Sequence, residues 1–175
     1  MKDSHPLKVL RYCPKCGSSE FKVSGERSLK CDICGFHFYV NASAAVAALV
    51  KNTEGKLMLV TRGVEPDLGK LDLPGGFVDH YETIENALKR ELDEELGLKV
   101  KSMHYAGSAP NEYKYSDFTV FTVDMAFEVE AETLENLHPH DDISDFRFYA
   151  ENEFSYEDIP ASSMKLFVKQ FFSKK

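Results

Sequence analysis

Residues 76–98 read Gly76-Phe-Val-Asp-His-Tyr-Glu82-Thr-Ile-Glu-Asn-Ala-Leu-Lys-Arg90-Glu-Leu-Asp-Glu-Glu-Leu-Gly97-Leu98 and carry most of the information in this 175-residue chain. Apolar side chains recur in this stretch at helical spacing, at Ile84, Ala87, Leu88 and Leu92. Such side chains share one face of a helix, and glycine favours the left-handed conformation that follows a helix end. The pattern therefore predicts a helix over residues 83–96 that stops at Gly97.

Three glutamates would lie on one face of this helix, because Glu91, Glu94 and Glu95 stand at positions i, i+3 and i+4. Each like-charge pair at this spacing costs about 0.2–0.5 kcal/mol, and the C-terminal end of a helix dipole also disfavours anions. A divalent cation would remove this penalty, and clustered carboxylate oxygens are typical ligands of Mg²⁺ or Mn²⁺. The simpler alternative is a solvated acidic face with Arg90 as the local counterion.

The full spacing of the stretch favours the metal site. It consists of Gly76, five residues, Glu82, seven residues, Arg90-Glu91, an aliphatic residue, any residue, Glu94-Glu95, any residue, Gly97 and an aliphatic residue. This pattern resembles the Nudix box, and the resemblance to Nudix hydrolases extends over about residues 42–172. It implies an α/β fold, a Nudix α/β/α sandwich with a mixed sheet.

The resemblance also implies a reaction, the hydrolysis of a nucleoside diphosphate derivative by attack of water on phosphorus. Glu91, Glu94 and Glu95 would bind the catalytic Mg²⁺ or Mn²⁺, and either Glu94 or Glu95 would activate the water. A backbone carbonyl of Gly75 or Gly76 would complete the metal shell. Arg90 would orient the glutamates and Glu82 would brace the loop before the helix. Of three downstream acids, Asp141, Asp142 and Asp145, we expect Asp145 to be a further metal ligand.

Two Cys-x-x-Cys pairs precede this domain, at Cys13 and Cys16 and at Cys31 and Cys34. Fourteen residues separate the pairs, a spacing that lets two turns present four thiolates to one tetrahedral ion. The segment resembles a zinc ribbon. We expect a structural Zn²⁺ there, with iron as the alternative ion, because a closed four-thiolate shell has no open position for a substrate. The sequence leaves open whether this ribbon also contacts RNA or a protein.

The chain as a whole is predicted to form two domains, a zinc-ribbon β mini-domain at residues 1–40 and a Nudix domain at residues 41–175. Short strands are expected at residues 21–23 and 36–40, and a hairpin is expected to pair residues 42–50 with residues 56–61. Further strands are predicted at residues 100–105, 118–130 and 145–149. A last helix is predicted near residues 162–172, with an apolar face typical of core packing.

Composition limits the function further. Hydrophobic residues make up 43% of the chain and charged residues 29%, as in folded globular proteins. The net charge of −8 argues against a broad basic surface, although residues 1–40 hold seven basic and four acidic residues. No apolar run approaches the roughly 20 residues of a membrane span, and the first residues lack a secretory signal. We therefore expect a cytoplasmic protein without membrane contact.

A zinc ribbon followed by a Nudix domain resembles the architecture of the NADH pyrophosphatase branch, which also includes enzymes that remove NAD caps from RNA. The chain departs from that branch, because it has no tryptophan and carries Ser108-Ala109-Pro110-Asn111-Glu112-Tyr113 in place of a Ser-Gln-Pro-Trp-Pro-Phe-Pro element. Ser108, Tyr113 and Tyr115 are expected to contact the substrate, with the ring of Tyr113 or Tyr115 stacked on a base. Ordinary packing of a loop is the alternative for the two tyrosines.

Several choices stay open at this point. ADP-ribose, a dinucleotide such as NADH and an oxidised nucleoside triphosphate are all compatible with the box. The alternative function is a nucleotide sensor or adaptor without catalytic activity, in which the Nudix fold binds a metabolite and the ribbon docks to protein or RNA. The intact glutamate set favours the enzyme. A homodimer is also compatible with the sequence.

Overall fold

The computed structural model describes residues 2–174 and divides the chain into two compact units. The first unit comprises Met1–Ala42 together with Glu112–Phe121, and the second comprises Ser43–Asn111 with Thr122–Lys175. We keep the boundary after residue 40 as a proposal. The structure thus adds Glu112–Phe121, a segment distant in sequence, to the N-terminal unit.

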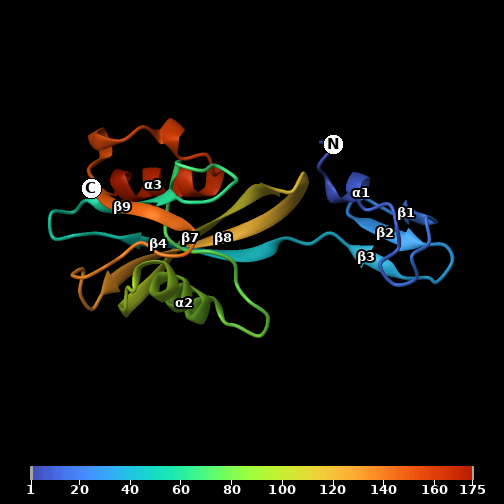
Figure 1. Ribbon diagram of the computed structural model, residues 1–175, viewed down its shortest axis with the longest axis horizontal. Coiled ribbons are helices and arrows are strands. Elements are labelled where there is room, and N and C mark those ends of the chain that lie inside the picture. The colour runs from blue at the N-terminus through green and yellow to red at the C-terminus, as the bar shows by residue number, and fades with distance from the viewer. Residues whose placement is uncertain (1, 175) are drawn as a thin grey trace. The chain divides into compact units, whose positions relative to one another are not determined.

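The first unit contains a short helix, α1 (Pro6–Val9), and an antiparallel sheet of three strands, β1 (Phe21–Val23), β2 (Ser28–Cys31) and β3 (His37–Tyr39) (Figure 1). Its small core consists of Leu7, Cys13, Phe21, Leu29 and Cys31. The predicted strands at 21–23 and 36–40 are confirmed, with the second one shortened. Strand β2 and helix α1 were not predicted, because each is too short for a periodic apolar pattern.

The second unit is built on two sheets, and only the ends of two long strands, within Glu112–Phe121, belong to the first unit. The first sheet has the order β4 (Ser43–Val50), β8 (Phe118–Ala131) and β7 (Val100–Tyr115), and β4 runs parallel to β8 from Ser43↔Thr122 to Val50↔Val129. The second sheet has the order β6 (Leu71–Asp72), β5 (Leu57–Arg62) and β9 (Ile143–Tyr149), and its pairs are antiparallel. Parallel and antiparallel pairs thus coexist, as the predicted mixed sheet requires.

Two helices cover opposite sides of these sheets. Helix α2 (Ile84–Leu96) lies below them in Figure 1 and helix α3 (Ser162–Ser173) lies above. Short 3₁₀ turns, η1 (Glu151–Glu153) and η2 (Tyr156–Asp158), lead from β9 to α3. The predicted helices at 83–96 and 162–172 and the predicted α/β/α sandwich are confirmed.

The alternation of strand side chains explains why both sides need a helix. In β4, Val46, Ala48 and Val50 are buried in the core that holds the apolar face of α2, whereas Ala47 and Leu49 are buried with α3. Strand β5 divides its residues in the same way, because successive side chains of a strand point to opposite faces. A strand that is apolar on both faces must be covered on both, and this makes β4 and β5 the centre of the sandwich.

The predicted hairpin between residues 42–50 and 56–61 is wrong in its pairing. The turn exists, with a hydrogen bond from the Asn52 amide to the Lys56 carbonyl (3.0 Å), and one isolated bridge joins Lys51 and Leu57. Beyond that bridge β4 pairs with β8 and β5 pairs with β9. The two strands separate into different sheets because each finds a longer partner elsewhere in the chain.

Strand β7 is much longer than predicted. The segment from Ser108 to Tyr115, which is expected to contact the substrate, is the second half of this strand. Pro110 obscures the strand pattern in the sequence, because proline is rare inside a sheet. Among residues 2–174, no helix has the length and apolar character needed to cross a bilayer.

Candidate active site around the box helix

Helix α2 begins and ends where its sequence requires. The Thr83 hydroxyl accepts a hydrogen bond from the Asn86 amide (3.2 Å) and so caps the N-terminus. At the other end Gly97 has φ 67°, and its amide donates to the Asp93 carbonyl (2.8 Å) while the Leu98 amide donates to the Leu92 carbonyl (3.0 Å). The bond from Gly97 to Asp93 is the αL type of helix cap, which needs a left-handed residue at Gly97.

The apolar face of α2 determines where the glutamates lie. Ala87, Leu88, Leu92 and Leu96 are fully buried in the core beneath β4 and β5. Glu91 and Glu95 border this face, and their backbone positions bring their carboxylates to the loop before the helix. Glu94 lies further out, with about half of its side chain exposed.

Arg90 connects most of these groups. Its Nε donates to Glu82 Oε1 (3.0 Å) and its Nη2 to Glu82 Oε2 (3.0 Å), a bidentate pair. Its Nη1 donates to Glu91 (2.9 Å) and to Glu94 (3.1 Å), and Nη2 also donates to the Phe77 carbonyl (3.0 Å). The pKa of Glu82 lies below its ordinary value, first because of Arg90 and then because of the Asp79 amide. One guanidinium therefore orients three acids and the loop.

The two glycines before the helix, Gly75 and Gly76, lie very close to the backbone of β4 and to the side chain of Glu91. A β-carbon on Gly76 would lie 2.5 Å from Glu91 Oε1, so only glycine leaves room for this carboxylate. A β-carbon on Gly75, where φ is 141°, would lie 2.1 Å from the Val46 carbonyl oxygen of β4. The loop runs alongside β4, and the Gly76 carbonyl accepts a hydrogen bond from the Val46 amide (2.9 Å).

Glu95 is the most buried acid of the site, with 7% of its surface exposed. Burial raises the pKa of Glu95 to about 8. The Gly75 amide, which donates a hydrogen bond to Glu95 Oε2 (3.0 Å), lowers this pKa by a smaller amount. The negative charges of Glu91, Asp72 and Asp142 raise the pKa further. Burial also raises the pKa of Glu91. A buried group of acids at this density is stabilised by a proton or by a cation, and its hard oxygen donors fit Mg²⁺ or Mn²⁺.

Two further charges act on Glu95: Asp72, which no sequence pattern singles out, and Asp142, one of the three downstream acids named above. Asp72 lies on β6 and forms an ion pair with Arg62 of β5 (3.4 Å), and burial raises the pKa of Asp72 to about 6. Asp142 precedes β9, and its charge reaches Glu95. The sequence offers no signal for Asp72 and favours Asp145 over Asp142, because the approach of Asp72 and Asp142 to α2 depends on the pairing of β5 with β6 and β9. Asp145 lies exposed on β9 opposite Thr61, and its role as a ligand stays a prediction.

The expected substrate residues lie on strand β7 and not on a loop. Ser108 is exposed and belongs to the second unit, whereas Tyr113 and Tyr115 belong to the hairpin segment of the first unit. Tyr115 is 59% exposed. Contact of these three residues with a substrate stays a prediction.

The four cysteines form a separate metal-binding group. Their sulfur atoms all lie within 4.8 Å of one another, with Cys13–Cys34 and Cys16–Cys31 distances of 3.6 Å. Tetrahedral ligands at the usual Zn–S length lie about 3.8 Å apart, so this geometry fits one ion. Gly17 and Gly35 follow the two pairs with φ 74° and 73° and allow the tight turns. The amides of Cys34 and Ile33 lower the pKa of Cys31 to about 7, which favours the thiolate.

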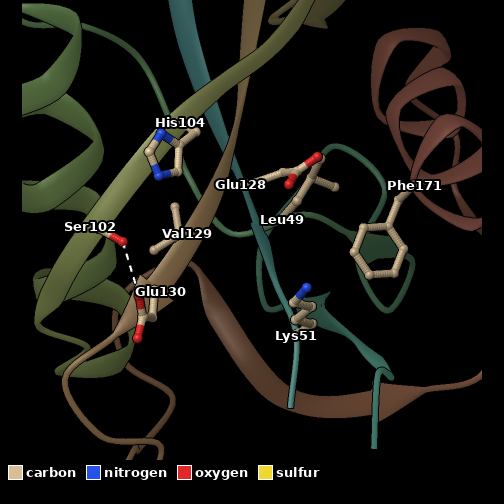
Figure 2. A pocket seen from close by; sticks show the side chains of 8 residues that line it. All are labelled: Leu49, Lys51, Ser102, His104, Glu128, Val129, Glu130 and Phe171. Atoms are coloured by element: carbon tan, nitrogen blue, oxygen red, sulfur yellow. Dashed lines mark hydrogen bonds between the residues drawn. The ribbon is translucent and has the colours of Figure 1, made fainter. Parts of the chain in front are cut away.

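The second unit also contains an open pocket of about 230 Å³ (Figure 2). Its lining includes Lys51, His104, Glu128 and Glu130. Both acids already have partners, because Glu130 accepts a hydrogen bond from Ser102 (3.1 Å) and pairs with Lys101 (2.5 Å), and Glu128 pairs with Lys174 (2.8 Å). None of the box residues lines this pocket, so it is distinct from the candidate active site.

Comparison with known proteins adds the family context. A family model described as the NUDIX domain matches residues 42–171. An NAD-capped RNA hydrolase NudC from Haemophilus influenzae (strain PittEE) is 32% identical over 139 residues, which cover 79% of this chain and 52% of that protein. The chain thus spans about half the length of the curated relatives it matches.

Two solved structures share the fold. A NUDIX hydrolase from Nitrosomonas europaea superposes with a TM-score of 0.66 at 20% identity and covers 95% of this chain and 92% of its own. The NUDIX domain of Shewanella oneidensis NrtR, complexed with ADP ribose, superposes with a TM-score of 0.59 at 18% identity and covers 77% and 88%. At these identities the likeness concerns the fold alone.

Proposed function

Because this chain belongs to the Nudix family, we propose that it hydrolyses the pyrophosphate bond of a nucleoside diphosphate derivative in the presence of Mg²⁺ or Mn²⁺. The observation that carries this proposal is the arrangement around Arg90, which contacts Glu82, Glu91 and Glu94 at 2.9–3.1 Å. A solvated acidic face would not need a guanidinium with five acceptor contacts or a glycine whose β-carbon would displace Glu91.

Each residue has a role in this proposal. Glu91, Glu94 and Glu95, together with a carbonyl of Gly75 or Gly76, would hold the cation, and Asp145 would be a further ligand. A bound dication polarises phosphoryl oxygens and lowers the pKa of the attacking water. Glu94 or Glu95 accepts the proton of that water. Arg90 keeps the acids in place before a cation binds, so that little reorganisation is needed.

The substrate class follows from the relatives and from the composition of β7. The printed name of the Haemophilus influenzae relative supports NAD-capped RNA and related NAD derivatives as candidates. The segment from Ser108 to Tyr113 differs from the aromatic and proline-rich element of the NADH pyrophosphatase branch, which supports a wider choice that includes ADP-ribose. Ser108, Tyr113 and Tyr115 would contact the moiety next to the pyrophosphate.

The four cysteines would hold a structural Zn²⁺ in this proposal. The sulfur distances of 3.6 Å and the burial of Cys13 and Cys31 support a closed tetrahedral site. All four thiolates would be used as ligands, which leaves the hydrolytic chemistry to the box carboxylates.

The test is a substrate panel with a matched set of variants. ADP-ribose, NADH, an NAD-capped RNA and an oxidised nucleoside triphosphate are incubated with Mg²⁺ or Mn²⁺, and the products are identified by mass spectrometry. Glu94→Gln and Glu95→Gln are each expected to lower kcat/KM by about a hundredfold or more, because they remove a ligand or the proton acceptor. Glu85→Gln, an exposed acid in the first turn of the same helix, is the control and should retain the wild-type rate.

The outcomes separate the alternatives. Near-normal activity of both variants would contradict their roles. Binding of a nucleotide without turnover by the wild type, under saturating Mg²⁺ and Mn²⁺, would favour the sensor or adaptor function over the enzyme.

A further inference from the structure

One face of the small N-terminal sheet carries basic and aromatic residues. The strand register places Lys22, Lys30 and His37 in one row across β1, β2 and β3, and Ser28 opposite Tyr39 in the next. We call Lys22, Lys30, His37 and Tyr39 the ribbon face. The opposite face of the sheet is apolar and includes Phe21, Leu29 and Cys31. The ribbon face is therefore not needed for the core of this unit.

The charges on the ribbon face are unevenly neutralised. Lys22 forms ion pairs with Glu20 (2.6 Å) and Asp32 (2.9 Å). Lys30 lies between Lys22 and His37 on the central strand, and within residues 2–174 it has no carboxylate within 4.0 Å. Like charges directly opposite each other destabilise a sheet, so an anion placed beside Lys30 would be favourable. Cys31 points to the other face, which separates the thiolate charge of a bound metal from Lys30.

The aromatic pair completes the surface. The rings of His37 and Tyr39 lie side by side on edge strand β3, with centroids 4.4 Å apart and planes inclined by 32°. The Tyr39 hydroxyl is 3.3 Å from His37 Nδ1, which holds the two rings together, and Tyr39 is 49% exposed. An exposed aromatic pair beside a free lysine has the chemistry of single-stranded nucleic acid binding, in which bases stack on rings and phosphates meet cations.

We propose that the ribbon face binds single-stranded RNA, with bases stacked on Tyr39 and His37 and a phosphate at Lys30. The choice of RNA over DNA rests on the proposed function, because an RNA attached to the hydrolysed pyrophosphate would offer a strand to this unit. The binding itself is independent of the box. Loss of this binding would therefore leave the hydrolysis of a free dinucleotide unchanged.

Fluorescence anisotropy of the full chain with a labelled, uncapped 12-nucleotide RNA tests the proposal. Tyr39→Ala and Lys30→Glu should each weaken binding by about tenfold or more, because each removes a stacking surface or reverses a phosphate contact. Tyr39→Phe keeps the ring and should bind like the wild type. Lys8→Glu makes the same charge change elsewhere in the unit and is the matched control, since the acid that Lys8 pairs with among residues 2–174 is the exposed Asp3.

Three further measurements make the result decisive. Metal content and circular dichroism confirm that each variant is folded. Hydrolysis of NADH or ADP-ribose should be unchanged in Tyr39→Ala and Lys30→Glu, so a failure of the proposed function is seen separately. The proposal is overturned if the wild type does not bind the RNA, if Lys8→Glu weakens binding as much as Lys30→Glu, or if DNA of the same sequence binds more tightly than RNA.

Discussion

Arg90 is the residue on which the candidate active site depends most directly. Glu91 and Glu94 repel each other on the same helix face, and the guanidinium lies between them at 2.9 and 3.1 Å. The same group holds Glu82 of the preceding loop. A single planar cation with several donors can do this, whereas a lysine offers one charge without the bidentate geometry.

The two glycines of the loop should respond differently to a methyl group. Gly75→Ala places its β-carbon against the Val46 backbone at 2.1 Å with φ 141°, so we expect a loss of about 3 kcal/mol or more in the free energy of unfolding. For Gly76→Ala the three atoms nearest the β-carbon belong to the movable Glu91 carboxylate, so stability is kept while kcat falls by about a hundredfold. Urea denaturation and steady-state kinetics distinguish the two, and equal stability of both variants would contradict the geometry.

The buried Glu95 should make stability depend on pH. Its pKa is raised to about 8, so the folded state binds the proton more tightly than the unfolded chain does. The protonated carboxyl makes its full contribution to the free energy of unfolding at a pH below 4.5, the ordinary pKa of a glutamate. This contribution is lost as the pH rises to about 8, the pKa of Glu95 in the folded state. In buffer without Mg²⁺ or Mn²⁺, the free energy of unfolding should fall between pH 5 and pH 8, and Glu95→Gln should reduce this fall. Identical pH profiles for both proteins would exclude the effect.

At the scale of elements, α2 connects the core to the candidate site. Its apolar face packs beneath β4 and β5, and this packing places Glu91 and Glu95 against the glycine loop. The loop in turn is fixed by backbone hydrogen bonds to β4, from Val46 to Gly76 and from Ala48 to Pro74. The helix and the strand therefore hold the site from both sides.

The end of α2 provides a test of this connection. Gly97→Ala forces a side chain into the left-handed conformation and should cost about 1–2 kcal/mol of stability, since the space around the β-carbon is open and only the backbone is strained. Gly97→Asn should lose less, because asparagine tolerates this conformation. Thermal denaturation measures both, and a more stable Gly97→Ala variant would show that the end of the helix is not strained.

At the scale of the whole molecule, the chain forms two units with separate cores. The core of the first unit has five buried residues, two of which are cysteines, whereas the second unit contains both large clusters. A core of this size does not stabilise a domain without a further crosslink, and a metal ion bound by four thiolates supplies one.

Removal of the metal should therefore affect the two units unequally. We expect about one zinc per chain by atomic spectroscopy, and Cys16→Ser or a strong chelator should release it. The amide signals of residues 11–40 should then lose their dispersion in NMR spectra, while those of α2 and β4 keep theirs. A metal-free chain with an ordered N-terminal unit would refute the zinc assignment.

Much of the fold and of the candidate site could be predicted because the relevant interactions are local. The α2 limits follow from apolar spacing and from Gly97, and the expected metal ligands Glu91, Glu94 and Glu95 lie within five residues of one another. The cysteine pairs likewise specify their group through two short turns. In each case neighbours in the chain are neighbours in space.

Long-range strand pairing could not be read in this way. Strands β4 and β5 are adjacent in the chain and equally apolar, and local patterns favoured a hairpin that the structure does not contain. Only the competition among all strands pairs β4 with β8 and β5 with β9, because the more extensive ladders stabilise the fold more. The pairing of β5 with β6 and β9 also brings the charges of Asp72 and Asp142 to Glu95. The chemistry of the box could thus be predicted from the sequence, whereas the electrostatic surroundings of the box arise from contacts between residues that are far apart in the chain.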